Sequence, residues 1–162
     1  MPKNSGDWPT TNDMIKKNQR LLVFTSKSAK EASEGIAYQW RYMVENQHGD
    51  GEMIDGSSPN RAESHPMNTT TRSLVLVNHF LSRPDIAQAC KHNSAPLMSL
   101  LNMCYGAAGK QWSNFVVVDF YKLLSREFVI PYSKLLKDHK KSVWQSGAHS
   151  YIVVGHHCAK QV

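Results

Sequence analysis

The stretch Asn114–Tyr121, NFVVVDFY, decides the fold class. Three consecutive valines between aromatic residues form a short apolar run without alternation, which is typical of a strand buried on both faces. Such strands belong to parallel sheets, whose functional groups lie just beyond the carboxyl ends. The run ends at Asp119, so this carboxylate is a candidate site residue. The alternative is that Asp119 only terminates the strand or caps the following turn.

Working outward, the preceding chain predicts a strand–helix–strand unit. Residues 73–78, SLVLVN, form another buried apolar run, and residues 95–108 carry apolar side chains at helical spacing, with Gly109 as a C-cap. Connections of this size place the two strands parallel. A further strand is expected at residues 20–25, RLLVFT. The alternation over residues 36–44 favours a strand near residues 42–47, although a helix of similar length remains an alternative.

Length and charge limit the function classes. The 162 residues suffice for one domain but fall short of the roughly 250 residues of an eight-stranded α/β barrel. The net charge of +6 is uneven: residues 1–121 hold 12 basic against 11 acidic residues, and residues 122–162 hold 7 against 2. The basic character therefore belongs to the tail, and no nucleic-acid-binding motif accompanies it, so a nucleic-acid partner is not expected.

The cysteines and histidines give no strong motif. Cys90 and Cys104 either form a disulfide, if the protein is secreted, or are free and buried, if it is cytosolic.

The N-terminal residues MPKNSGDWP contain no apolar core, so no signal peptide is expected, and the cellular compartment stays open. A metal site at residues 156–158, His-His-Cys, is not expected, because neighbouring strand residues point to opposite faces. The sequence leaves the cofactor open, including whether calcium takes part. The polar composition of residues 47–71 predicts a long surface loop.

Several long strings resemble one family. They are VFTSKSAKEASEGIAYQWRY (residues 23–42), SPNRAESHPMNTTTRSLVLVNHF (58–80), ACKHNSAPLMSLLNMCYGAAGKQW (89–112) and NFVVVDFYK (114–122). Together they resemble the plant PLC-like phosphodiesterases, which carry a phosphatidylinositol-specific phospholipase C X domain. The resemblance covers about residues 1–122. It implies an α/β fold in which this chain supplies the C-terminal half of a TIM-type barrel, followed by a divergent basic tail at 123–162.

The resemblance also implies an activity, phosphoric diester hydrolysis of a phosphoinositide-type lipid. In that family two histidines from the first half of the barrel act as general base and general acid. An arginine stabilises the phosphate, and a late carboxylate orients a histidine. The segments expected to supply the histidines and the arginine are missing from this sequence. The chain is therefore expected to be inactive alone; the alternative is a non-catalytic binding module or a truncated product.

Four positions carry over as candidate site residues. Asp119 matches the carboxylate that orients a histidine, and is the catalytic candidate. Lys27 matches a basic headgroup-binding side chain, although a solvated lysine is the simpler interpretation. Glu45 and Gln47 lie at a mouth-facing position and are expected to bind sugar hydroxyls. His79 stands where the family pattern has an aromatic residue, which favours a packed histidine.

Two departures from the family pattern matter. Ser58 occupies a position where relatives commonly have a cysteine, which removes one expected disulfide partner. The tail after Lys122 does not match the family's continuation, and a retained intron is one explanation. Half a barrel exposes sheet edges and an apolar inner face, so self-association through those edges is expected, as is peripheral contact with a membrane.

Overall fold

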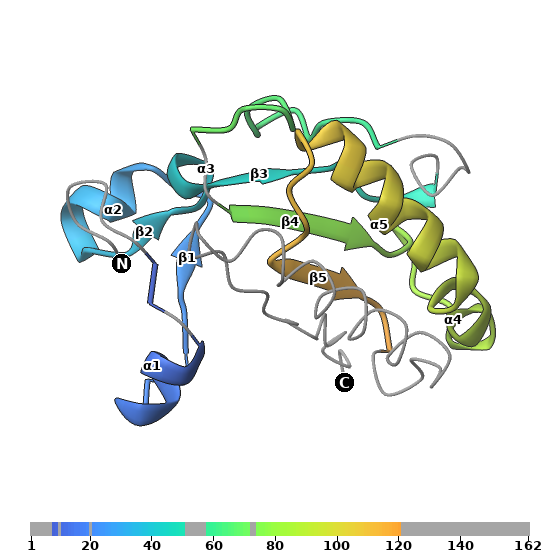
Figure 1. Cartoon of the computed structure of the whole chain (residues 1–162), viewed down its shortest axis with the longest axis horizontal. Coiled ribbons are helices and arrows are strands. Elements are labelled where there is room, and N and C mark those ends of the chain that lie inside the picture. The colour runs from blue at the N-terminus through green and yellow to red at the C-terminus, as the bar shows by residue number, and fades with distance from the viewer. Residues whose placement is uncertain (1–7, 10, 20, 51–57, 72–73, 121–162) are drawn as a thin grey trace.

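A computed structural model describes residues 8–9, 11–19, 21–50, 58–71 and 74–120, and the tail expected at 123–162 lies outside these ranges. The fold is mixed α/β, and short parallel strands and helices follow one another along the chain (Figure 1). The elements are α1 (Thr11–Lys16), β1 (Phe24–Thr25), α2 (Ala29–Glu34), β2 (Ala37–Tyr38), α3 (Gln39–Tyr42), β3 (Met43–Glu45), β4 (Leu74–His79), α4 (Ile86–His92), α5 (Ala95–Ala107) and β5 (Phe115–Val118).

The main sheet has the order β3-β4-β5, and all of its pairings are parallel. The predicted strands at 73–78 and 114–121 are thus confirmed as β4 and β5, with α5 between them as expected. The sequence prediction missed α4, which lies between β4 and α5. Asp85 caps this helix by accepting a hydrogen bond from the Ala87 amide at 2.9 Å.

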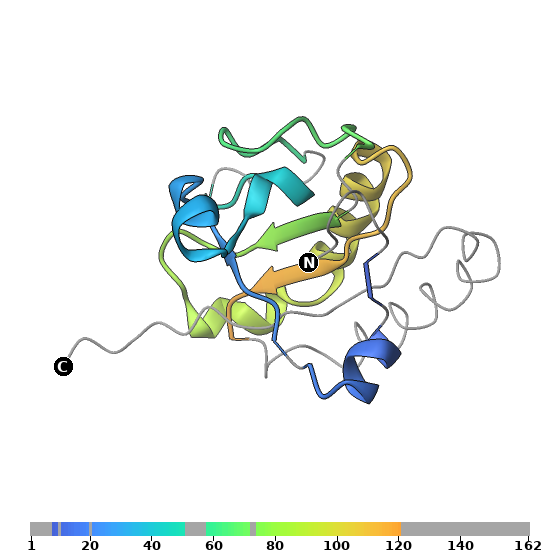
Figure 2. The ribbon, with the colours of Figure 1, turned by 90° about the vertical axis from the view of Figure 1, so that its left-hand side faces the viewer.

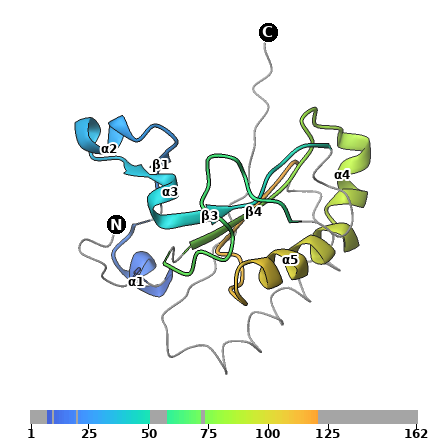
Figure 3. The ribbon, with the colours of Figure 1, turned by 90° about the horizontal axis from the view of Figure 1, so that it is seen from above.

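The two faces of the main sheet bury different side chains. One face packs on α5, which lies across the strands (Figures 1 and 3). Its core is aliphatic and consists of Val44, Val75, Val77, Val116 and Val118 from the sheet, Leu97, Leu100, Leu101, Cys104 and Ala108 from α5 and its C-cap, and Met67. We call the opposite face the inner face. Near the amino ends of the strands it buries Met43, Leu74 and Phe115 beneath Trp8, Leu22, Phe24, Tyr42 and Leu76.

The N-terminal part of the chain departs from the prediction. The expected strand at residues 20–25 is wrong in extent, because only Phe24–Thr25 pairs, and its partner is β2. Leu21 is 77% exposed and Val23 is 50% exposed, since no described element covers that side of the segment. The strand expected near 42–47 is present as β3 and is preceded by the one-turn helix α3. Figure 2 shows the β1–β2 segment beside the main sheet.

The described strands therefore form two sheets, of two and three strands, and no closed barrel is present among the described residues. Cys90 is exposed and Cys104 is buried, and both are free, so a bridge between them is wrong and burial holds only for Cys104. Across the described ranges, no helix is both long and apolar enough to cross a bilayer.

Candidate functional site

Polar side chains gather where the strands of the main sheet end. Met43 and Glu45 alternate with Val44, and Leu76 and Asn78 alternate with Val77, so the inner face changes from apolar to polar along each strand. The register pairs Glu45 with Leu76 and Asn78 with Val117, which places them in successive rows of that face. Asp119 follows the last residue of β5.

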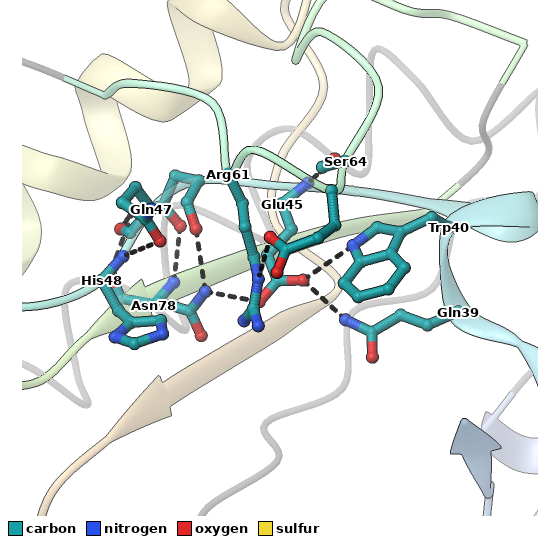
Figure 4. Close-up of polar contacts among 10 residues, drawn as sticks. Gln39, Trp40, Glu45, Gln47, His48, Arg61, Ser64 and Asn78 are labelled. Carbon is teal, nitrogen blue, oxygen red and sulfur yellow. Dashed lines mark hydrogen bonds and ion pairs between the residues drawn. The ribbon is translucent and has the colours of Figure 1, made fainter. Parts of the chain in front are cut away.

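Glu45 is the centre of this group (Figure 4). Its Oε1 accepts hydrogen bonds from Arg61 Nη1 at 2.9 Å and from Asn78 Nδ2 at 2.8 Å. Its Oε2 accepts from Gln39 Nε2 at 2.6 Å and from Trp40 Nε1 at 3.1 Å. The residue is only 2% exposed. A carboxylate offers about four acceptor sites, so these donors satisfy it fully and make its burial tolerable.

Main-chain contacts hold the segment after residue 58 against β3. The Arg61 amide donates to the Glu45 carbonyl at 3.0 Å, and the Glu45 amide donates to Ser64 Oγ at 2.9 Å. The Gln47 amide donates to the Pro59 carbonyl at 2.8 Å. This segment therefore returns beside the strand and delivers Arg61 to the Glu45 carboxylate, although 16 residues separate the two in sequence.

Arg61 is fixed on three sides. Besides Glu45, it donates from Nε to Glu63 Oε2 at 3.1 Å, and its guanidinium carbon lies 5.5 Å from the centroid of the Trp40 ring. Burial lowers the pKa of Arg61 more than any other single influence. The charge of Glu45 and the hydrogen bonds to Glu63 and Glu45 outweigh it, so the pKa is raised overall.

Two asparagines join β3 to β4 beyond their regular pairing. The main-chain N–H of Asn78 donates to Asn46 Oδ1 at 2.6 Å, and Asn46 Nδ2 donates to the main-chain carbonyl of Asn78 at 3.0 Å. Asn78 Nδ2 also donates to the Asn46 carbonyl at 2.9 Å. Both residues are buried, and these bonds replace the ones that water would otherwise make. The end of the sheet is therefore rigid at the point where Glu45 lies.

The structure places the predicted site residues in different settings. Asp119 is buried, and its carbonyl accepts from Asn93 Nδ2 at 2.8 Å, which ties the end of β5 to the end of α4. Gln47 accepts at Oε1 from the His48 amide at 3.1 Å. Glu45, Gln47 and Asp119 thus all lie at the carboxyl end of the main sheet. Lys27 does not, because it is exposed between β1 and α2, on the smaller sheet.

His79 is packed, as the sequence analysis favoured. It is 3% exposed, and its Nε2 donates to the His92 carbonyl of α4 at 2.9 Å. Burial is the main cause of its lowered pKa, and it outweighs the opposing effect of that hydrogen bond. His79 follows Asn78 and points to the helix layer, away from Glu45.

Sequence reasoning missed Arg61, Trp40 and Asn78. Asn78 could have been predicted from the sequence, because it is the last residue of the predicted strand SLVLVN and follows the inner-face residue Leu76 by two positions. Arg61 gave no signal, since it lies in a long polar loop and its role depends on the return of that loop to β3. Among the described residues, no group of three His, Cys, Asp or Glu side chains is arranged to hold a metal ion.

Comparison with known proteins identifies a family. The family model for the PI-PLC X domain (PI-PLC X 1) matches residues 3–125. The chain belongs to the PI-PLC X family. A PI-PLC X domain-containing protein of Arabidopsis thaliana is 51% identical over 121 residues, which cover 75% of this chain and 28% of that relative. This PI-PLC X chain thus spans little more than a quarter of its relative's length, and no solved structure matches it.

Proposed function

We propose that the chain forms part of a phosphoric diester hydrolase of the PLC-like kind, acting on a phosphoinositide-type lipid. Membership of the PI-PLC X family supports the reaction class. The observation that carries the proposal is the gathering of Glu45, Gln47, Asn78 and Asp119 at the carboxyl ends of parallel strands. In α/β folds that edge is where ligands bind. In this proposal the strands belong to a TIM-type barrel of which the chain supplies one portion.

Asp119 is the proposed catalytic contribution of this chain. It is buried beyond β5, and its main chain is fixed by Asn93. Phe120 adopts a left-handed conformation, with φ of 48°, so the chain turns immediately after the carboxylate. A carboxylate held in this way is suited to orient a histidine that acts as a general acid or base. Glu45, Gln47 and Lys27 are proposed to serve the headgroup.

The chain by itself is proposed to be inactive. The mechanism needs a pair of histidines at the mouth, and His79, which ends β4, and His48, which follows β3, make other contacts. His79 bonds α4, and His48 stacks on Phe80 with ring centroids 4.8 Å apart. The histidine pair is therefore assigned to the part of the family fold that this chain does not cover. Contact with the lipid surface is peripheral, and β5, paired on one side only among the described strands, is a candidate edge for self-association.

The test compares the chain alone with a chimera. The 121 matching residues would replace the corresponding segment of the Arabidopsis relative. Both proteins would then be assayed for release of water-soluble phosphate ester from phosphatidylinositol vesicles. We expect no turnover by the 162-residue chain and measurable turnover by the chimera.

The matched variant is Asp119→Asn in the chimera, which keeps the shape and removes the charge. Its turnover should fall by roughly 10²-fold or more if the carboxylate orients an essential histidine. Turnover by the chain alone would contradict the inactive assignment. A folded chimera without turnover would contradict the hydrolase assignment, while headgroup binding without turnover would favour a binding module.

A further inference from the structure

The segment that returns beside β3 carries a short motif that the proposed reaction does not use. Asn68 is followed by Thr69 and Thr70, so a hydroxyl stands two positions after an asparagine with no proline between them. This pattern is the acceptor signal for N-linked glycosylation. Of the ten asparagines in the sequence, only Asn68 has serine or threonine at that spacing. Because so short a motif also arises by chance, its structural setting decides whether a glycan fits there.

A buried neighbour turns Asn68 toward the solvent. The Thr69 N–H donates to the Pro66 carbonyl at 2.9 Å, which closes a four-residue turn. Met67 anchors this turn: its side chain is buried in the aliphatic core, and its amide donates to Asn60 Oδ1 at 2.7 Å. The next residue, Asn68, is exposed. The turn is thus fixed by Met67 and by main-chain groups, and it presents the Asn68 side chain to the solvent.

The second group of the motif is also on the surface. Thr70 is exposed, and its methyl carbon lies near Gly109, just beyond the end of α5: a Cβ added to that glycine would be 3.5 Å from Thr70 Cγ2. The contact is thus made on the methyl side of Thr70. An enzyme that must recognise an asparagine together with a nearby hydroxyl can therefore reach both residues.

The turn lies on the helix side of the main sheet. Met67 packs in the core between the sheet and α5, and Thr70 lies beside the end of that helix. Figure 1 shows the segment over residues 58–71 passing along the sheet near the end of α5. The Glu45 carboxylate belongs instead to the opposite, inner face. A glycan on Asn68 would therefore extend from the outer side of the fold and leave the polar end of the inner face open.

Asn102 offers an internal comparison. It is exposed on α5 and is followed two positions later by Cys104, which has no hydroxyl and is only 1% exposed. The residue that would have to be recognised together with Asn102 is thus enclosed in the core. Exposure of the asparagine alone does not make an acceptor, and Asn102 should stay unmodified.

We propose that Asn68 is an N-glycosylation site, recognised together with Thr70. The sugar donor is an oligosaccharide linked through a pyrophosphate to a lipid, and an oligosaccharyltransferase of the secretory pathway performs the transfer. Asn68 Nδ2 forms a bond to C1 of the first sugar and gives up one proton. The bond from C1 to the pyrophosphate oxygen breaks, and the lipid pyrophosphate leaves with that electron pair. The modification is independent of the proposed hydrolase reaction.

The experiment directs the full 162-residue chain into the secretory pathway of a eukaryotic host with a cleavable leader. Protein from the lumen and the medium is pooled, so the result does not depend on release from the cell. We expect one N-linked glycan, seen as a mobility shift that peptide:N-glycosidase abolishes. Because Asn68 is exposed, this enzyme should remove the glycan from the native protein as completely as from denatured protein. Removal converts the acceptor to aspartate, and peptide mass spectrometry should locate that change at residue 68 and not at residue 102.

Variants of the two threonines separate the motif from its surroundings. Thr70→Ala should abolish the glycan, whereas Thr70→Ser should retain it, because serine keeps the hydroxyl. Thr71→Ala is the matched control: it removes a hydroxyl from the neighbouring exposed threonine, outside the motif, and should leave the glycan in place. Asn68→Gln should abolish the glycan. Without the leader, this variant should melt at the same temperature as the wild type, since Met67 and main-chain groups hold the turn.

Three results would overturn the proposal. They are a wild-type lumenal chain without a glycan, a glycan that persists in Thr70→Ala or maps to Asn102, and a glycan that the enzyme releases only after denaturation. The last result would mean that Asn68 is not on the surface. Turnover by the chimera, or its absence, has no bearing on these outcomes, so the glycosylation site and the hydrolase assignment fail separately.

Discussion

Replacing Ser58 with cysteine should create a stabilising disulfide with Cys104. Ser58 Oγ is in direct contact with Cys104 Sγ, at the C-terminal end of the buried face of α5. The two residues are 46 positions apart. Closing a loop of that length in the unfolded chain removes about 14 cal/mol/K of entropy, or about 4 kcal/mol at 25 °C. Engineered bridges often deliver less, so an increase in the free energy of unfolding of about 2 to 4 kcal/mol is expected.

The assay is urea unfolding of the oxidised and reduced forms of Ser58→Cys, with the bridge verified by mass spectrometry. For a domain of this size the oxidised form should also melt roughly 5 to 15 °C higher. The control is Ser58→Cys with Cys104→Ala, which cannot form this bridge and should respond to reductant no more than the wild type. Cys90 and Cys158 are changed to Ser in all variants, so that neither can form a competing bridge.

Two outcomes would refute this reasoning. If Ser58→Cys remains reduced under oxidising conditions, the two side chains do not meet as the structure places them. If the bridge forms without stabilising the protein, the native state is strained by it. The sequence analysis expected a cysteine at position 58 from the family resemblance, and Cys104 is the residue that Ser58 touches.

Two further predictions concern a glycine and a buried thiol. Gly49→Ala should destabilise the protein by about 1 to 3 kcal/mol in urea unfolding, because φ is +109° and an added Cβ would lie 2.8 Å from Ser82 Oγ. Gly106→Ala in α5 should instead stabilise the protein by about 0.5 to 1 kcal/mol, because no atom lies within 4 Å of the added Cβ. Burial raises the pKa of Cys104 from 9.0 to about 11, despite the opposing contact with Ser58, so the folded state holds this proton more tightly than the unfolded state. The Cys104 proton therefore contributes about 3 kcal/mol to the free energy of unfolding below pH 9, and this contribution is lost as pH rises from 9 to 11. The difference in unfolding free energy between wild type and Cys104→Ala should shrink over that pH range. A constant difference would contradict the prediction.

The sequence predicted the strands that are buried on both faces and the helix between them. SLVLVN and NFVVVDFY are continuous apolar runs, and α5 carries its leucines at helical spacing, so local pattern and burial agree. RLLVFT has the same pattern but forms only two paired residues, since the neighbours that would cover Leu21 and Val23 are not among the described elements. The hydrophobic pattern indicates which side chains of a segment can be buried, but tertiary contacts decide whether they are buried.

The candidate site was predicted only in part, for a similar reason. Position after a buried strand indicated Asp119, because residues at the carboxyl ends of parallel strands share one edge. Glu45 and Gln47 were indicated by the family resemblance. Lys27 followed the same rule but lies on the smaller sheet. Arg61 could not be found in this way, because it reaches Glu45 through the return of a loop whose main chain bonds β3 at residues 45 and 47. No periodic pattern encodes such a contact.

The inner face separates stability from recognition along the same strands. At the amino ends it buries Met43, Leu74 and Phe115 under aromatic side chains, where truncation would cost several kcal/mol through cavity formation. Further along the sheet, Glu45 of β3 and Asn78 of β4 belong to a fully bonded polar network. Because that network is complete without any ligand, its rigidity does not depend on one. A ligand at the carboxyl end of the sheet would therefore meet side chains already held in place, and its affinity would not be reduced by the cost of ordering them.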